Sequence, residues 1–313
     1  MWSSATHFSI LLGLAASLAV AASEPVPAPA PVTKLPTDTI LVKGAWSSAS
    51  DSTTPLPEAG TVSPGSYDNR YFGLTLPLPN GWIQKYAGPP PSDSGYYVLA
   101  QLVANDNAPQ TGRGTALITA QDLFFSSTRA NSPLELINYT RDHLQAAYQI
   151  ERTPVAVTIA GRNFVRFGYR APAAGLHWSI LATQMRCHVV EFVFTSANTQ
   201  LLEMLERDLS SMKLSQSDDA APVCIKDYAN ATNIIERVEP LFGEPKFNAV
   251  PVRIVIDREG KVKHIHFLSA FPAQAQAITA AVSQWRFKPY KRDGQALEVE
   301  TGILFGRGPR AAL

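Results

Sequence analysis

Short runs of β-branched and aromatic residues, separated by turn residues, fill most of residues 68–215 and predict a series of β-strands. The first run ends at Pro77 and at the pair Asn80-Gly81, which favour turns over regular structure. We expect strands at residues 71–76, 96–103, 115–120, 155–159, 163–169, 177–184 and 187–195. The close succession of strands in the second half indicates an antiparallel meander.

Two segments of the same region repeat their apolar residues with the period of an α-helix. One begins at Ser132-Pro133-Leu134-Glu135, where Ser can cap, Pro suits the first turn and Glu completes a capping box. The other follows the last strand and gathers on one face Leu201, Leu202, Leu205, Leu209 and Met212. We therefore expect residues 66–215 to form an α/β sandwich domain, an antiparallel sheet with helices.

Residues 222–308 repeat this mixture on a smaller scale, after a short polar hinge at residues 215–221. The helices expected here lie at residues 233–241 and 273–284, and a final strand at 297–305. Two further strands meet at a hairpin where Gly260 can supply the positive φ of the turn. The pattern predicts a small three-stranded antiparallel sheet with helices, so the fold class of the whole chain is α+β.

The first 22 residues carry an apolar run that ends in the small residues Ala19-Val20-Ala21, as a cleaved export signal does. The run is shorter than the roughly 20 residues of a membrane span, and retention as a membrane anchor is the alternative. Residues 23–65 are rich in Pro and then in Ser, Thr and Asp, which predicts a linker. Either fate of residues 1–22 takes the chain out of the cytoplasm.

Composition and motifs do not point to an enzyme. The formal net charge is +1, so no global field favours nucleic acid as a partner. Cys187 and His188 are neighbours on an expected strand, where their side chains point to opposite faces and cannot act as a nucleophile–base pair. His264 and His266 share a face, but no Cys or acidic cluster completes a metal site. We expect no catalytic residue, metal or cofactor; an unrecognised hydrolase in residues 66–215 is the alternative.

The chain has two cysteines, one in each expected domain. Outside the cytoplasm, Cys187 and Cys224 could form a disulfide that joins the two domains. The alternative is two separate buried thiols, and the sequence leaves both interpretations open.

The C-terminal part resembles the C-terminal domain of the TonB energy-transducer family over residues 236–306. The resemblance rests on the order of three segments, at residues 252–262, 280–290 and 294–305. The residues of the structural motif are Gly260, Trp285, Phe287, Pro289 and Tyr290. We expect Trp285 to lie in the core, between the helix and the sheet. The TonB domain binds other envelope proteins and catalyses nothing, so the resemblance implies a protein-binding role.

In that family the last strand receives a peptide from an outer-membrane receptor by strand addition. Carried over to this chain, the docking edge comprises Leu297, Glu298, Val299, Glu300, Thr301, Gly302, Ile303, Leu304 and Phe305. Ser3 and His7 have a spacing similar to that in TonB-type membrane anchors. If the N-terminus is retained, the resemblance implies contact with inner-membrane motor proteins.

Residues 66–215 loosely resemble the PsbP/Mog1-like fold, including an early Pro-Leu-Pro-Asn-Gly-Trp segment. Taken together, these patterns and the resemblance predict an exported, non-enzymatic periplasmic or cell-envelope protein with a TonB-like protein-binding domain. The resemblance to TonB implies a link to energy-dependent transmembrane transport. The alternative is a soluble periplasmic adaptor whose α/β domain binds a small molecule or lipid.

Overall fold

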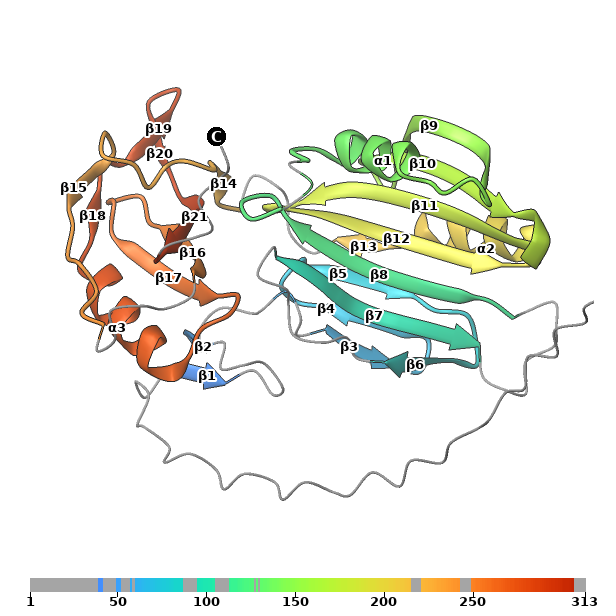
Figure 1. The fold of residues 1–313 in the computed structure, drawn as a ribbon, viewed down its shortest axis with the longest axis horizontal. Coiled ribbons are helices and arrows are strands. Elements are labelled where there is room, and N and C mark those ends of the chain that lie inside the picture. The colour runs from blue at the N-terminus through green and yellow to red at the C-terminus, as the bar shows by residue number, and fades with distance from the viewer. Residues whose placement is uncertain are drawn as a thin grey trace, which may run out of the picture. The chain divides into compact units, whose positions relative to one another are not determined.

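A seven-stranded antiparallel sheet forms the centre of the part of the protein that precedes residue 215 (Figure 1). The computed structural model describes residues 39–41, 49–51, 57, 60–86, 95–104, 113–126, 128, 130–214, 221–242 and 249–306. All of them belong to one unit that begins at Lys34. The strands, in spatial order, are β6 (Trp82–Tyr86), β7 (Tyr96–Ala104), β8 (Thr115–Asp122), β12 (His188–Ser196), β11 (Leu176–Met185), β10 (Arg162–Ala171) and β9 (Gln149–Ile159). Every neighbouring pair is antiparallel.

The two faces of this sheet pack against different helices, because side chains alternate across each strand. On β12, Val189 packs in a cluster with α1 (Pro133–Asp142), whereas Phe192 packs in the main core with α2 (Thr199–Leu209). The helices thus lie on opposite faces of the sheet. A one-turn 3-10 helix at Pro172–Ala174 links β10 to β11.

Both helices begin with a side-chain cap. The Oγ of Ser132 accepts a hydrogen bond from the N–H of Glu135 at 3.2 Å, as the sequence predicts for α1. The Oδ1 of Asn198 accepts one from the N–H of Gln200 at 3.0 Å at the start of α2. The caps set where each helix begins and therefore which residues face the core.

A four-stranded sheet completes the main core on the α2 side. Its order is β13 (Lys213–Leu214), β5 (Leu74–Pro77), β4 (Ser66–Asn69) and β3 (Gly60–Ser63). The expectation that residues 23–65 form only a linker is wrong at residues 39–41, 49–51 and 60–63, which form strands. The last of these, β3, pairs with β4 and packs Val62 against the core. A strand of four residues lacks enough alternation to stand out from a Ser- and Thr-rich segment.

The C-terminal sheet has six strands where three were expected. Its antiparallel centre is β17 (Val262–Phe267), β16 (Val250–Ile256) and β21 (Val299–Phe305). β14 (Val223–Cys224) adds parallel to β21, and β2 (Ala49–Asp51), which pairs with β1 (Thr39–Leu41), adds to β17. The three added strands have only two or three residues each, which is too short for a periodic signal.

One helix, α3 (Pro272–Val282), packs on this sheet. The helix expected at residues 233–241 is absent: β15 (Ile234–Glu236) pairs with β18 (Arg286–Phe287) instead. The Oδ1 of Asn230 accepts hydrogen bonds from the N–H groups of Thr232 and Asn233, which closes a turn in place of a first helical turn. β19 (Tyr290–Arg292) and β20 (Gln295–Leu297) form a short hairpin before β21.

Candidate functional site

The two edges of β21 differ in how far they are paired. Along the inner edge, each residue of β21 lies opposite a residue of β16. Along the outer edge, the N–H groups of Val223 and Ile225 donate to the carbonyls of Glu298 and Glu300 at 2.8 and 3.0 Å. β14 ends there, and within the described ranges no other strand pairs with the rest of this edge.

The direction of the backbone N–H and C=O groups alternates along β21, and this alternation decides which residues can hydrogen-bond at the open part of the edge. The N–H and C=O of one strand residue point to the same side, and those of the next residue point to the opposite side. Because Glu298 and Glu300 direct their carbonyls toward β14, Gly302 and Leu304 direct their polar backbone groups the same way. Leu304 is also 53% exposed. Gly302 and Leu304 are therefore the positions where a further strand could hydrogen-bond.

The expected docking edge of residues 297–305 is shortened by this arrangement. Leu297 belongs to β20, and Glu298 lies between β20 and β21, where its carboxylate pairs with Lys263 at 2.8 Å. Val299 and Glu300 already face β14. The residues left for a partner strand are Thr301, Gly302, Ile303, Leu304 and Phe305.

One face of β21 is closed by the loop that follows β8. A Cβ atom at Gly302 would lie 2.6 Å from the Cβ of Phe124 and 2.9 Å from the Cζ of Phe125. Glycine is therefore needed at this position, since any larger residue would push the loop away. At Gly302 this face of the strand is covered, and the outer edge of the strand is not covered by any described strand.

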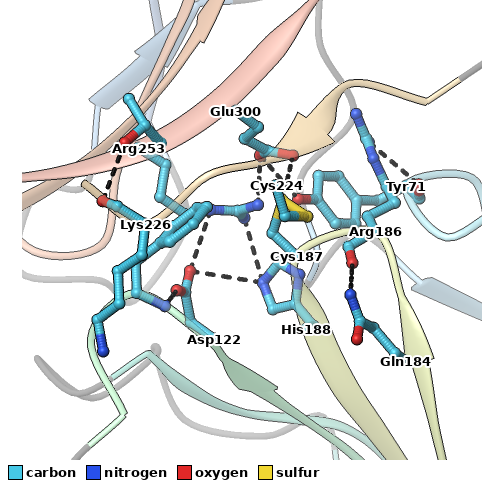
Figure 2. Close-up of a disulfide and its surroundings, with 12 residues drawn as sticks. Tyr71, Asp122, Gln184, Arg186, Cys187, His188, Cys224, Lys226, Arg253 and Glu300 are labelled. Carbon is cyan, nitrogen blue, oxygen red and sulfur yellow. Dashed lines mark hydrogen bonds and ion pairs between the residues drawn. A yellow bond between two sulfur atoms is a disulfide. The ribbon is translucent and has the colours of Figure 1, made fainter. Parts of the chain in front are cut away.

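Behind this edge lies a buried ion pair between Arg253 of β16 and Glu300 of β21, which are 1% and 3% exposed (Figure 2). A guanidinium N–H of Arg253 donates to Oε1 of Glu300. The Nε of Arg253 lies 3.0 Å from Oδ2 of Asp122, at the end of β8. The hydroxyl of Tyr71 donates to Oε1 of Glu300 at 3.3 Å. The cluster therefore joins residues that are far apart in the sequence, and each charge depends on the others to offset its burial.

His188 completes the cluster as a neutral imidazole. Its Nε2 lies 3.1 Å from Nη1 of Arg253, and because a guanidinium only donates, Nε2 must accept. Burial, reinforced by the charge of Arg253, lowers the pKa of His188 well below its usual value. The proton therefore sits on Nδ1, which is buried and has no hydrogen-bond partner in the part of the chain that the structure describes.

The site raises the pKa of Asp122 and that of Arg253, for different reasons. Burial raises the pKa of Asp122 to about 6, against the opposing charge of Arg253. For Arg253, burial alone would lower the pKa, but the negative charges of Glu300 and Asp122 outweigh it and raise the pKa. Arg253 is therefore cationic at neutral pH.

Cys187 and Cys224 form a disulfide directly beside this cluster, with their Cα atoms 5.4 Å apart. The Sγ of Cys187 also lies 3.3 Å from Oε2 of Glu300. A disulfide sulfur carries no proton, so this is a packing contact and not a hydrogen bond. Of the two interpretations that the sequence left open, the structure has the bridge, and it ties β14 to the turn between β11 and β12.

The remaining motif residues differ in burial. Trp285 is fully buried, and its Nε1–H donates to the carbonyl of Val238 at 2.7 Å. Phe287 is buried beside it, Tyr290 is half-buried and Pro289 is exposed. At Gly260, φ is +83° and a Cβ atom would lie 2.0 Å from the carbonyl oxygen of Phe287.

Sequence reasoning missed the buried charges. A signal was present at Arg253, which stands alone in the otherwise apolar run Val-Pro-Val-Arg-Ile-Val-Ile of β16. Such an arginine needs a buried acidic partner. Which acid it would find depends on the pairing of β16 with β21 and on the approach of β8, and neither is encoded locally.

Comparisons with solved structures concern the fold. The chain is similar to the solution structure of cyanobacterial PsbP (CyanoP) from Synechocystis sp. PCC 6803, with 18% identity over 51% of this chain and 98% of that chain, and a TM-score of 0.33. It is also similar to the crystal structure of LpqN, described as involved in cell envelope biogenesis of Mycobacterium tuberculosis, with 14% identity over 45% of this chain and 82% of that one, and a TM-score of 0.30. No curated protein sequence matches this chain.

A protein-family comparison bears on the C-terminal sheet. Residues 249–306 match the family model described as Gram-negative bacterial TonB protein C-terminal. This stretch runs from just before β16 to just after β21, so it contains β16, β17, α3 and the open edge. The match confirms the TonB-like domain recognised in the sequence.

Proposed function

We propose that this chain is a non-enzymatic protein of the cell envelope that binds an extended segment of a partner protein along the outer edge of β21. The observation that carries the proposal is the direction of the backbone of Gly302 and Leu304, away from β16 and beyond the end of β14. A partner strand at this edge would continue the sheet through main-chain hydrogen bonds. Exposed Leu304 adds an apolar contact for the partner's side chains.

The partner class follows from the TonB-like match. TonB C-terminal domains interact with envelope proteins and receptors, so the partner proposed is an envelope protein or an outer-membrane receptor peptide. An exposed strand edge is a liability that proteins usually cover. Here β14 covers only the first part of the edge, which supports a binding role for the remainder.

Export and transport belong to the same proposal. We place the chain in the periplasm, with residues 1–22 as a signal, residues 66–215 as a PsbP/Mog1-like domain and residues 222–308 as the TonB-like domain. Retention of residues 1–22, which include Ser3 and His7, would instead allow contact with inner-membrane motor proteins and energy-dependent transport. That segment lies outside the described residues; among the described ones, no helix has the length and apolar character needed to cross a bilayer.

Photo-crosslinking in intact cells tests the proposal. A benzoylphenylalanine placed at Leu304 should give a discrete adduct with an envelope protein, and mass spectrometry of the adduct should locate one extended segment. The matched control is the same group at Ile235, which is 60% exposed on β15. Equal adducts from both positions, or none from Leu304, would contradict the proposal.

A further inference from the structure

A pocket of about 390 Å³ lies beside the disulfide, bounded by the turn between β11 and β12, by β14 and by β19. Its walls include Gln184 from the end of β11, Arg186 from the turn, Cys224 from β14 and Arg292 from β19. Among the residues that the structure describes, two guanidinium groups line it and no acidic side chain does. The pocket therefore offers an unbalanced positive charge in a concave site.

Arg186 is held in place with part of its hydrogen-bonding capacity unused. Its backbone has a φ of +50°, and its guanidinium lies 4.2 Å from the centre of the Tyr71 ring. Its Nη1 donates to the carbonyl of Tyr71 at 3.2 Å. Its buried Nε has no hydrogen-bond partner within the ranges that the structure describes. Stacking and one hydrogen bond thus orient a cation that lines the pocket and has no ion pair among the described residues.

Arg292 approaches the pocket from the other side. It lies in the exposed β19–β20 hairpin, and no ion pair to it exists among the described residues. Two arginines that share a pocket match a planar carboxylate, which accepts hydrogen bonds from guanidinium groups in a fork geometry.

The backbone of β14 adds a strand edge to the same pocket. Val223 and Ile225 donate their N–H groups to β21, so the alternation directs the N–H and C=O of Cys224 away from that strand. β14 is the last strand of its sheet. Cys224 thus presents one donor and one acceptor of the main chain to a molecule that enters the pocket.

We propose that this pocket binds an acidic side chain of an extended partner peptide, whose main chain pairs with Cys224 while its carboxylate lies between Arg186 and Arg292. The site is on β14 and does not use the open edge of β21, so it goes beyond the function proposed above. It makes the sheet selective, because main-chain pairing alone is nearly independent of sequence whereas the two arginines require an acid.

Peptide binding tests the site. The probes are fluorescein-labelled Thr-Val-Glu-Val-Thr and its versions with Gln or Lys at the centre, titrated by anisotropy with the full chain. We expect the Glu peptide to bind, and the Gln and Lys peptides to bind at least about tenfold more weakly, the usual scale for one charge-assisted interaction. Arg292→Gln should weaken the Glu peptide to the level of the Gln peptide, and Arg186→Gln should do the same.

The control is Arg258→Gln, which removes an exposed arginine of the β16–β17 turn and should leave binding unchanged. Thermal unfolding of each variant separates loss of the site from loss of the fold. Equal binding of the Glu and Gln peptides, no binding at all, or unchanged binding by Arg292→Gln would overturn the proposal. Binding that appears only in the double variant Asp218→Asn and Asp219→Asn would also overturn it, because the chain's own acids would then be the ligand.

Discussion

Arg253 and Glu300 lie on adjacent strands in a diagonal relationship, since Arg253 is opposite Gly302 and Glu300 is opposite Val255. Their side chains meet on the face of the sheet that is turned away from the Trp285 core, together with Asp122 and His188. The C-terminal sheet is therefore buried on both faces at this point. Its free surface for a partner is an edge.

Replacing Arg253, the cation of the buried cluster, should lower the free energy of unfolding. Arg253→Met leaves Glu300 and Asp122 buried without their counter-charge, so we expect a loss of about 3–5 kcal/mol in the free energy of unfolding. Urea denaturation measures it. The control is Lys263→Met, which breaks the more exposed pair with Glu298 and should cost less than about 1 kcal/mol. Equal effects of the two substitutions would show that the buried cluster is not a stabilising unit.

Reduction of the disulfide between Cys187 and Cys224 should lower the free energy of unfolding. Cys187 and Cys224 are separated by 37 residues, and loop-closure entropy for such a loop predicts a loss of about 4 kcal/mol. Denaturation with and without a phosphine reductant measures it. In the double variant with Ala at both positions the reductant should have no effect. A wild-type protein that is insensitive to reductant while its thiols become titratable would contradict the prediction.

Two glycines with the same backbone conformation should respond differently to substitution. Gly260 and Gly294 have φ values of +83° and +81°, but a Cβ atom at Gly260 would meet the Phe287 carbonyl at 2.0 Å, whereas none of the described atoms lies within 4 Å at Gly294. Gly294→Ala should therefore cost about 1 kcal/mol for the left-handed backbone alone. Gly260→Ala carries the same cost plus the steric conflict, and we expect at least about 3 kcal/mol by urea denaturation. Equal losses would show that this close approach is absent.

Glu191 on β12 should make stability fall as the pH rises toward neutrality. Burial raises its pKa from 4.5 to about 7, partly offset by a hydrogen bond from Thr119 at 3.4 Å. Between pH 4.5 and 7 the folded chain therefore holds a proton that the unfolded chain has released, and folding loses free energy as the pH rises through this window.

Glu191→Gln, which imitates the protonated group, should be more stable than the wild type by about 1–3 kcal/mol at pH 8 and equal to it near pH 4. The difference between the two proteins is the quantity to measure, because His188 acts in the opposite direction: its lowered pKa costs stability as the pH falls below 6.5. A difference that does not change with pH would contradict the assignment to Glu191.

The long elements were predictable from the sequence, and the short ones were not. The strands β7, β8, β10, β11 and β12 and the helices α2 and α3 carry several core residues each, so their period shows in the sequence. β14 and β15 have two or three residues and form because a distant strand supplies their hydrogen bonds. For the same reason, the docking edge predicted at residues 297–305 took no account of β14, which already pairs with Val299 and Glu300.

The most direct test of the binding edge compares two substitutions at Leu304, with the partner segment recovered by crosslinking as the ligand. Leu304→Pro removes the outward N–H and leaves the ladder with β16 intact, whereas Leu304→Ala keeps the N–H and removes only the side chain. We predict that Leu304→Pro binds the segment at least about tenfold more weakly than Leu304→Ala, the scale of a lost main-chain hydrogen bond with its partner left unpaired. Equal affinity of the two variants for the segment would contradict strand addition at β21.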